Sequence, residues 1–193
     1  MVKIVNLIAE ISTIWSCNMK RVLLLGLAVS YLFLSGCSTI PTDDIKVVSE
    51  SDPKAKFSGY KTYAWLGSAG VLLDPEGQWK PADFDIDAEI TFLINKEFRN
   101  RNMLETDKKP DLIVSYVLGV NMAALKKKVD PKSNITILKN VPQGALIVAL
   151  LDAESGFVIW AASATAEIKN LGSEQAKKRL EYVTSQMFKQ LPK

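Results

Sequence analysis

Histidine is absent from this chain of 193 residues. Histidine is the commonest general base in enzymes and the commonest protein ligand for transition metals. Its absence therefore excludes Ser-His-Asp and Cys-His catalytic sites and the usual zinc hydrolase centres. No other catalytic motif is recognisable in the sequence. We therefore expect a protein that is not an enzyme and that holds neither a metal nor a cofactor.

Cysteine is scarce, because the chain has only two, Cys17 and Cys37. If a leader ends at Gly36, only Cys37 remains, and a single cysteine forms no internal disulfide. The stability of the folded domain must then come from its hydrophobic core. Removing residues 1–36 leaves 157 residues, which is the length of one domain.

The part of the chain after the predicted leader carries almost no net charge. The formal net charge of the whole chain is +3, and residues 1–36 contribute three basic residues and one acidic residue to it. The remainder carries 21 basic and 20 acidic residues. Proteins that bind nucleic acid concentrate basic residues on one face, so we expect no nucleic-acid partner.

The leader, predicted over residues 1–36, has the organisation of a signal peptide. A basic pair, Lys20–Arg21, precedes twelve mostly apolar residues at 22–33. Twelve helical residues rise about 18 Å, which is much less than the ~30 Å hydrocarbon core of a bilayer. The pattern therefore favours a cleaved leader over a transmembrane helix. Because Met19 directly precedes the basic pair, our hypothesis is that translation begins there and not at Met1.

The residues around Cys37 resemble the lipobox of bacterial lipoproteins, with Leu34, Ser35 and Gly36 before the cysteine. The resemblance implies cleavage before Cys37, diacylglycerol on its sulfur, and a further acyl chain such as palmitate on the new amino group. Two or more chains hold a protein stably on a membrane. Ser38 follows, not aspartate, and by resemblance to lipoprotein sorting this favours the periplasmic face of the outer membrane. The inner membrane is the alternative.

Residues 37–56 are predicted to be a lipidated, flexible tether, because they are mostly polar and contain two prolines. Beyond the tether, in residues 57–193, some segments have apolar residues at the spacing of a strand and others at the spacing of a helix. Strands are predicted over 60–65 and 111–118, a short edge strand over 135–138, and a hairpin from 145–151 and 157–168. Helices are predicted over 86–98, capped by Asp85, and over 176–191, capped by Ser173.

The order of these elements indicates an α+β domain with two layers. We expect an antiparallel-rich sheet of about four to five strands packed against two helices. The apolar run at 111–118 predicts a central strand of this sheet, because such a strand is covered by its neighbours.

Four segments, 57–65, 110–114, 151–160 and 188–192, resemble one family of bacterial lipoproteins, the domain-of-unknown-function family 4136. Together they span almost the whole predicted domain. The chain departs from the family pattern at Asn102, where a glycine is usual, and at Ala161–Ala162, where a polar residue and a glycine are common. The resemblance implies a fold and an envelope location. It implies no mechanism, because the family has no established activity.

Candidate interaction residues come from two predicted loops. Trp79 lies in the loop predicted over 67–81, which offers little to bury its ring, and a row of lysines follows at Lys126, Lys127 and Lys128. These side chains form our candidate interaction surface for an envelope protein or a cell-envelope polymer. The alternative is that the lysines are simply a solvated loop and that aromatic side chains pack in the core.

Two other functions are left open by the sequence. An envelope hydrolase would need two carboxylates in one cleft, and the candidates are Asp74, Glu76, Asp83 and Asp152. A structural or stress-related surface lipoprotein would need no ligand. The acidic residues at 83–89 resemble a calcium loop but lack its glycine and its final glutamate, so they are better explained as the negative start of a helix.

Overall fold

Six strands form the main sheet in the computed structural model, which describes residues 40–132 and 134–193. From edge to edge the strands are β1 (Lys46–Ser51), β8 (Val158–Glu167), β7 (Gln143–Asp152), β4 (Leu112–Asn121), β2 (Thr62–Leu73) and β3 (Leu104–Glu105). Strand β2 is parallel to both of its neighbours, and all other pairs are antiparallel. The leader, Leu34, Ser35, Gly36, Cys37 and Ser38 lie outside the described residues.

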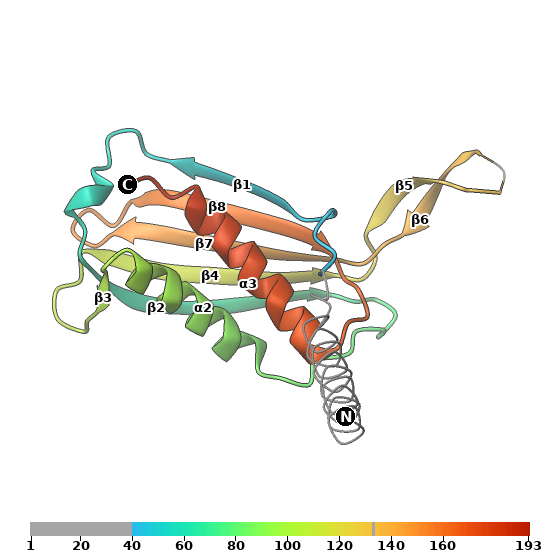
Figure 1. Ribbon diagram of the computed structural model, residues 1–193, viewed down its shortest axis with the longest axis horizontal. Coiled ribbons are helices and arrows are strands. Elements are labelled where there is room, and N and C mark those ends of the chain that lie inside the picture. Colours follow the sequence, from blue (N-terminus) through green and yellow to red (C-terminus); the bar gives the residue numbers. More distant parts are fainter. Residues whose placement is uncertain (1–39, 133) are drawn as a thin grey trace, which may run out of the picture. The chain divides into compact units, whose positions relative to one another are not determined.

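Two helices, α2 (Ile86–Asn100) and α3 (Ser173–Lys189), cover one face of the sheet (Figure 1). The prediction of a two-layer α+β fold with an antiparallel-rich sheet is therefore confirmed. The predicted strand number was too low, because β1 and the two-residue β3 extend the sheet to six strands. Strand β4 is central, as predicted, and lies between β2 and β7.

The predicted tether ends earlier than we expected, because Lys46–Ser51 is strand β1. This strand pairs antiparallel with β8, from Lys46 opposite Thr165 to Ser51 opposite Trp160. Only alternate side chains of an edge strand face the core, and here Val47 is the apolar residue that packs against it. Because most of its other positions are polar, the segment lacks the apolar pattern by which a strand is recognised in a sequence. A short 3-10 helix, η1 (Phe57–Gly59), connects β1 to β2.

Strand β2 is longer than the predicted strand over 60–65. It continues to Leu73, so the first half of the predicted loop is strand. A register shift between Trp65 and Gly67 interrupts its pairing with β4, and Gly67 has a φ of 144°. Such a φ is open to glycine but not to most other residues. The glycine-rich sequence therefore marks a β-bulge and not the end of the strand.

The helix ends largely follow the sequence. Asp85 caps α2, because its carboxylate accepts a hydrogen bond from the backbone N–H of Ala88. Asn102 has a φ of 58°, the left-handed conformation expected after a helix. The cap predicted at Ser173 was wrong. Gly172 occupies that position, and the Ser173 hydroxyl instead donates to Asp83 at 3.0 Å.

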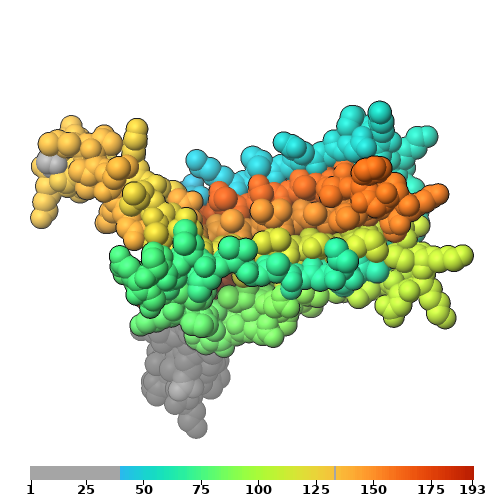
Figure 2. Space-filling model, turned by 180° about the vertical axis from the view of Figure 1, so that it is seen from behind, coloured from blue at the N-terminus to red at the C-terminus, as the bar shows by residue number. Residues whose placement is uncertain are grey.

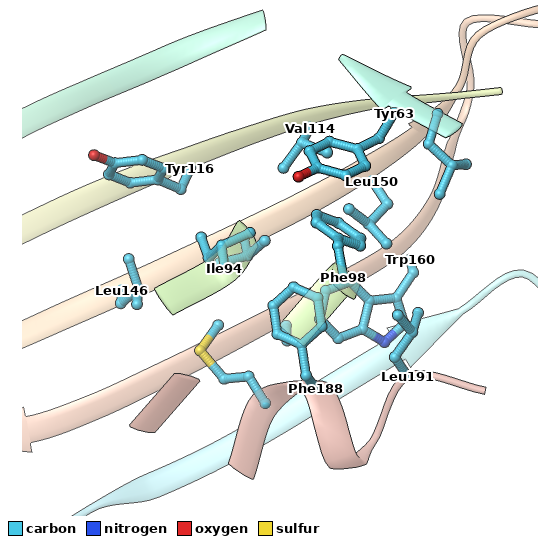
Figure 3. Packing of buried hydrophobic residues seen from close by; sticks show 14 of the residues in the cluster. Tyr63, Ile94, Phe98, Val114, Tyr116, Leu146, Leu150, Trp160, Phe188 and Leu191 are labelled. Carbon is cyan, nitrogen blue, oxygen red and sulfur yellow. The ribbon is translucent and has the colours of Figure 1, made fainter. Parts of the chain in front are cut away.

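Aromatic rings fill the core at one end of the helix layer (Figure 3). Tyr63 stacks on Phe98 with ring centroids 4.3 Å apart, and Phe98 meets Phe188 edge-on at 5.2 Å. Trp160 of β8 packs against Phe188 at 5.5 Å. All four side chains are buried. We call this region the closed end of the domain.

A second, two-stranded sheet lies between β4 and β7 in the sequence. It consists of β5 (Leu125–Val129) and β6 (Thr136–Asn140), and it projects from the main body (Figures 1 and 2). The lysine row was predicted to be loop but belongs to β5. Residues 135–138 were predicted to be an edge strand, and β6 pairs only with β5. The chain enters and leaves this hairpin at the opposite end of the sheet from the closed end.

Candidate apolar binding cleft

A cleft of about 650 Å³ opens between α3, the loop before α2 and the ends of β4, β7 and β8. Its size lies within the range of roughly 300–1,000 Å³ that is typical of small-molecule sites. Its apolar lining includes Trp79, Phe84, Leu118, Val120, Met122 and Leu180. We call this region the hollow end of the domain, because the same helix–sheet interface that is filled at the closed end is open here.

The loop that forms one wall of the cleft is fastened at both of its ends. The Asp74 carboxylate accepts hydrogen bonds from the backbone N–H groups of Gln78 at 2.9 Å and Trp79 at 2.7 Å. Further along the loop, Asp83 accepts from Ser173 of α3, and the Lys177 ammonium lies 5.2 Å from the centre of the Phe84 ring. The wall is therefore positioned before any ligand arrives.

A buried ion pair forms another part of the lining. Arg179 of α3 donates to both carboxylate oxygens of Asp44, at 3.0 and 2.7 Å, and also to the backbone carbonyl of Pro41. The Asp44 carboxylate further accepts from the Lys169 ammonium and from the backbone N–H of Glu167, both at 2.7 Å. Only 7% of the Asp44 side chain and 9% of the Arg179 side chain are exposed. These bonds join the start of the described chain to α3.

The charge state of Asp44 follows from these contacts. Burial alone would raise its pKa, because it disfavours the charged form. The hydrogen bonds from Arg179, Lys169 and the Glu167 backbone act in the opposite direction and outweigh burial. They hold the pKa of Asp44 far below its ordinary value of 3.8. The carboxylate therefore stays ionised at every physiological pH and neutralises the cations beside the cleft.

This neutralisation determines which ligands suit the cleft. Arg179 and Lys169 both line the cleft, but both form ion pairs with Asp44. An anionic group would have to compete with a bound carboxylate, and a buried cation would find no free acid at this ion pair. The ion pair therefore favours a neutral, apolar group over a charged one at its side of the cleft, which Lys80 and Asp83 also line.

Trp79 lies where a ligand would bind, half-buried in the wall of the cleft. The lysine row lies elsewhere, on the hairpin, so the structure does not unite the candidate interaction surface. Lys126 and Lys128 form ion pairs with Glu167 at 3.1 and 3.3 Å, whereas Lys127 is exposed. The predicted surface thus divides into a cleft residue and a separate basic hairpin.

The four candidate carboxylates are not gathered at one place. Asp152 accepts hydrogen bonds from Tyr60 and Ser155 at the closed end, whereas Asp74 follows the far end of β2. The paired strands between these positions run about nine residues, or roughly 30 Å. Glu76 binds the Gln78 side chain, and Asp83 binds Ser173. Each carboxylate thus has a local structural contact.

The described residues hold no group of three or more acidic or cysteine side chains arranged to bind a metal ion. In the same part of the chain, no helix has the length and apolar character needed to cross a membrane.

The Asp44–Arg179 pair was not anticipated from the sequence, because Asp44 was assigned to the tether. A signal existed on the helix. Arg179 interrupts the apolar stripe formed by Ala176, Leu180 and Val183, and a charge at such a position requires a buried partner. The sequence does not indicate which acidic residue supplies it, because the partner lies 135 residues away.

A family model matches residues 47–193, and its description is "Domain of unknown function (DUF4136)". The chain belongs to the DUF4136 family. The family assignment made from the four sequence segments is therefore confirmed, and the match includes β1, which we had placed in the tether. A comparison with curated proteins gives no significant match.

One solved structure of the same family agrees with the fold. A DUF4136 family protein from Bacteroides thetaiotaomicron is similar over 77% of this chain and 96% of its own, with 11% identity and a TM-score of 0.50. A PDZ domain protein from Parabacteroides distasonis is similar over 78% of this chain, with 13% identity and a TM-score of 0.47; this chain spans only 36% of it. The PelC dodecamer of Paraburkholderia phytofirmans has a TM-score of 0.42 at 16% identity, over 72% of this chain and 96% of its own. At such identities the likeness concerns the fold alone.

Proposed function

We propose that this DUF4136 protein is a non-catalytic envelope lipoprotein that binds the acyl chain of an envelope lipid in its apolar cleft. The observation that carries the proposal is the open cavity of about 650 Å³ at the hollow end. Its walls are largely apolar and the charges of Asp44, Lys169 and Arg179 are paired with one another, so burial of a neutral hydrocarbon chain would be favourable.

The predicted lipid attachment at Cys37 supports this ligand class. Pro41 is four residues after Cys37, and its carbonyl is bound by Arg179 beside the cleft. Four residues of chain span at most about 14 Å. A domain held so closely by a lipidated cysteine would keep its cleft near a bilayer, and we place that bilayer at the periplasmic face of the outer membrane.

Binding can be tested with the neutral dye N-phenyl-1-naphthylamine, whose fluorescence rises in apolar sites. We expect the protein to bind the dye and a neutral monoacylglycerol to displace it. Ala166→Leu extends a side chain of the cleft lining and should abolish binding. The matched control is Ala161→Leu, on the opposite face of the same strand and outside the cleft, which should bind as the unchanged protein does.

Two results would contradict the proposed ligand site. One is dye binding that Ala166→Leu leaves intact, because the dye would then be bound elsewhere. The other is the absence of any dye binding by the correctly folded protein. Release of a hydrolysis product from the monoacylglycerol would argue instead for the hydrolase alternative.

The lipid attachment has a separate test. Mass spectrometry of the mature protein from membranes should show a chain that begins at Cys37 and carries diacylglycerol and an additional acyl group. Cys37→Ala should remove these additions and release the domain from the membrane fraction. A mature chain that retains residues before Cys37 would contradict the predicted processing.

A further inference from the structure

The β5–β6 hairpin has two chemically different faces. In an antiparallel pair, residues directly opposite each other share a face, and so do residues two apart along one strand. Lys127 is opposite Leu138, so these two share a face with Leu125 and Val129. Lys126 and Lys128 lie on the other face, where both bind Glu167. We call the first of these the outer face of the hairpin.

The outer face presents three exposed apolar side chains, together with Lys127, Thr136 and Asn140. Leu125 is 63% exposed, Val129 is 59% exposed and Leu138 is 66% exposed. Exposed apolar side chains gathered on one element mark an interaction site more often than isolated ones do. A lone two-stranded hairpin is also marginally stable in water, and a partner on its apolar face would stabilise it. The chemistry of the neighbouring groups indicates which partner this is.

Lysines whose charge is not neutralised accompany the apolar side chains. Within residues 40–132 and 134–193, the side chains of Lys127, Lys132 and Lys139 form no ion pair, in contrast to Lys126 and Lys128. Lys127 lies among the leucines, Lys132 is in the turn at the hairpin tip, and Lys139 is opposite Lys126 on the other face of the hairpin. Apolar side chains next to free cations are the combination that binds the surface of a bilayer with anionic lipids.

The position of the hairpin makes a bilayer the nearest partner. Both strands join the sheet at its hollow end, because the chain leaves β4 at Asn121 and returns at Gln143. Glu167, which holds Lys126 and Lys128, donates its backbone N–H to Asp44. Asp44 in turn is seven residues from the predicted lipid site. A membrane that holds Cys37 would therefore be within reach of the hairpin.

We propose that the outer face of the β5–β6 hairpin inserts its leucines and valine into the surface of an anionic bilayer and thereby orients the hollow end toward the membrane. This inference rests on the proposed lipid attachment for the identity of the partner. It concerns a different surface from the cleft. The hairpin would provide a second membrane contact beside the lipid, and it would place the cleft where a lipid chain can enter.

The test uses a lipid-free chain that begins at Ile40, so that Cys37 cannot contribute. Among the described residues, all members of the hydrophobic cluster lie between Ile45 and Leu191, so this chain contains the core that they form. Its binding is measured by flotation with phosphatidylcholine vesicles, with and without phosphatidylglycerol, at low and high salt. We expect binding to the anionic vesicles that weakens as salt is raised.

Two sets of substitutions separate the contributions of the hairpin. Replacing Leu125, Val129 and Leu138 by threonine keeps residues that favour strands and should weaken vesicle binding by about tenfold or more. Replacing Lys127, Lys132 and Lys139 by glutamine should weaken it on the order of a hundredfold on anionic vesicles and hardly at all on neutral ones.

Matched controls lie at the closed end. Phe157→Ser removes a side chain that is 73% exposed, and glutamine at Lys54, Lys56 and Lys108 removes three charges. These variants should float as the unchanged chain does. Dye binding by the cleft, measured without vesicles, should be the same in all hairpin variants and shows that they are folded.

Three results would overturn the inference. The first is a folded domain that does not bind anionic vesicles at any salt concentration. The second is equal loss of binding in the hairpin variants and the closed-end controls. The third is a domain that dimerises through Leu138, detected by sedimentation, and that has no affinity for vesicles. Each leaves the lipid on Cys37, which is measured by mass, and the dye in the cleft untouched.

Discussion

The two ends of the helix–sheet interface are built from the same elements but are filled differently. At the closed end, Tyr63, Phe98, Trp160 and Phe188 interlock and exclude water. At the hollow end, the same strand β8 presents Ala164 and Ala166, and α3 presents Ala176. Small side chains there leave an open cavity where large ones could have filled it.

This difference separates the part of the interface that supports the fold from the part that is available to bind. Protein interiors are normally packed as densely as organic crystals, and each unfilled volume costs stability. The open cleft of about 650 Å³ beside this well-packed core is therefore the part of the interface that a ligand could fill. Substitutions at the two ends should therefore change the free energy of unfolding by unequal amounts.

The largest expected effect is at the closed end. Phe98→Ala should lower the free energy of unfolding by about 3–5 kcal/mol, because it removes a buried ring from a region that cannot collapse. Phe84→Ala is the matched change at the hollow end and should cost roughly 1 kcal/mol, because that ring is already half-exposed beside a cavity. Urea denaturation measures both, and equal losses would remove the distinction between the two ends.

Asp44→Asn should be the next largest effect, at about 3 kcal/mol, because it leaves the Arg179 charge buried without its partner. The pKa of Asp44 is lowered in the folded state, so its stabilisation is present above the unfolded value of 3.8 and is lost as pH falls below it. The difference in unfolding free energy between the two proteins should therefore be constant from pH 5 to 7 and shrink below about pH 4. A difference that does not depend on pH in acid would show that the charge of Asp44 is not its source.

A smaller effect is expected from adding volume to strand β8. Ala162→Leu adds a large side chain at a buried position between the two ends and should cost about 1–3 kcal/mol. Ala166→Leu points the same addition into the cleft and should be neutral or slightly stabilising. Thermal unfolding of the two variants compares them directly. A destabilisation of Ala166→Leu as large as that of Ala162→Leu would mean that the hollow end has no room for a ligand.

The smallest effect on stability is expected at the hairpin. Leu138→Thr should change the free energy of unfolding by less than about 0.5 kcal/mol, because the side chain is exposed and contributes nothing to the core. Chemical denaturation of the lipid-free domain gives this value. A loss of more than about 1 kcal/mol would indicate that Leu138 packs within the domain and is not free to meet a membrane.

The sequence predicted the closed end better than the hollow end. Helical and strand periods identified both helices, the central strand β4 and the β7–β8 hairpin, because their buried faces are continuous. Strand β1 was missed since only one side chain in two faces the core, and β2 was cut short at Gly67, which marks a bulge. The spacing of apolar residues shows which side chains are buried. It does not show which strand an edge strand pairs with.

The candidate site was less predictable for a related reason. Trp79 was selected as a residue with little in its own loop to bury it, and it lies in the cleft wall. The cavity itself results from side chains that are small, and a missing volume leaves no periodic signal in a sequence. Likewise, Asp44 and Arg179 are 135 residues apart, so only the folded chain brings them together.

A titration of methyl groups by nuclear magnetic resonance tests the central claim most directly, because it reports where a neutral monoacylglycerol binds. We expect saturable shifts for the methyl groups of Leu118, Val120 and Met122, which line the cleft, and unchanged signals for Leu112 and Val114 in the closed core. Shifts spread over the whole surface, or no shifts in the cleft at saturating ligand, would contradict it.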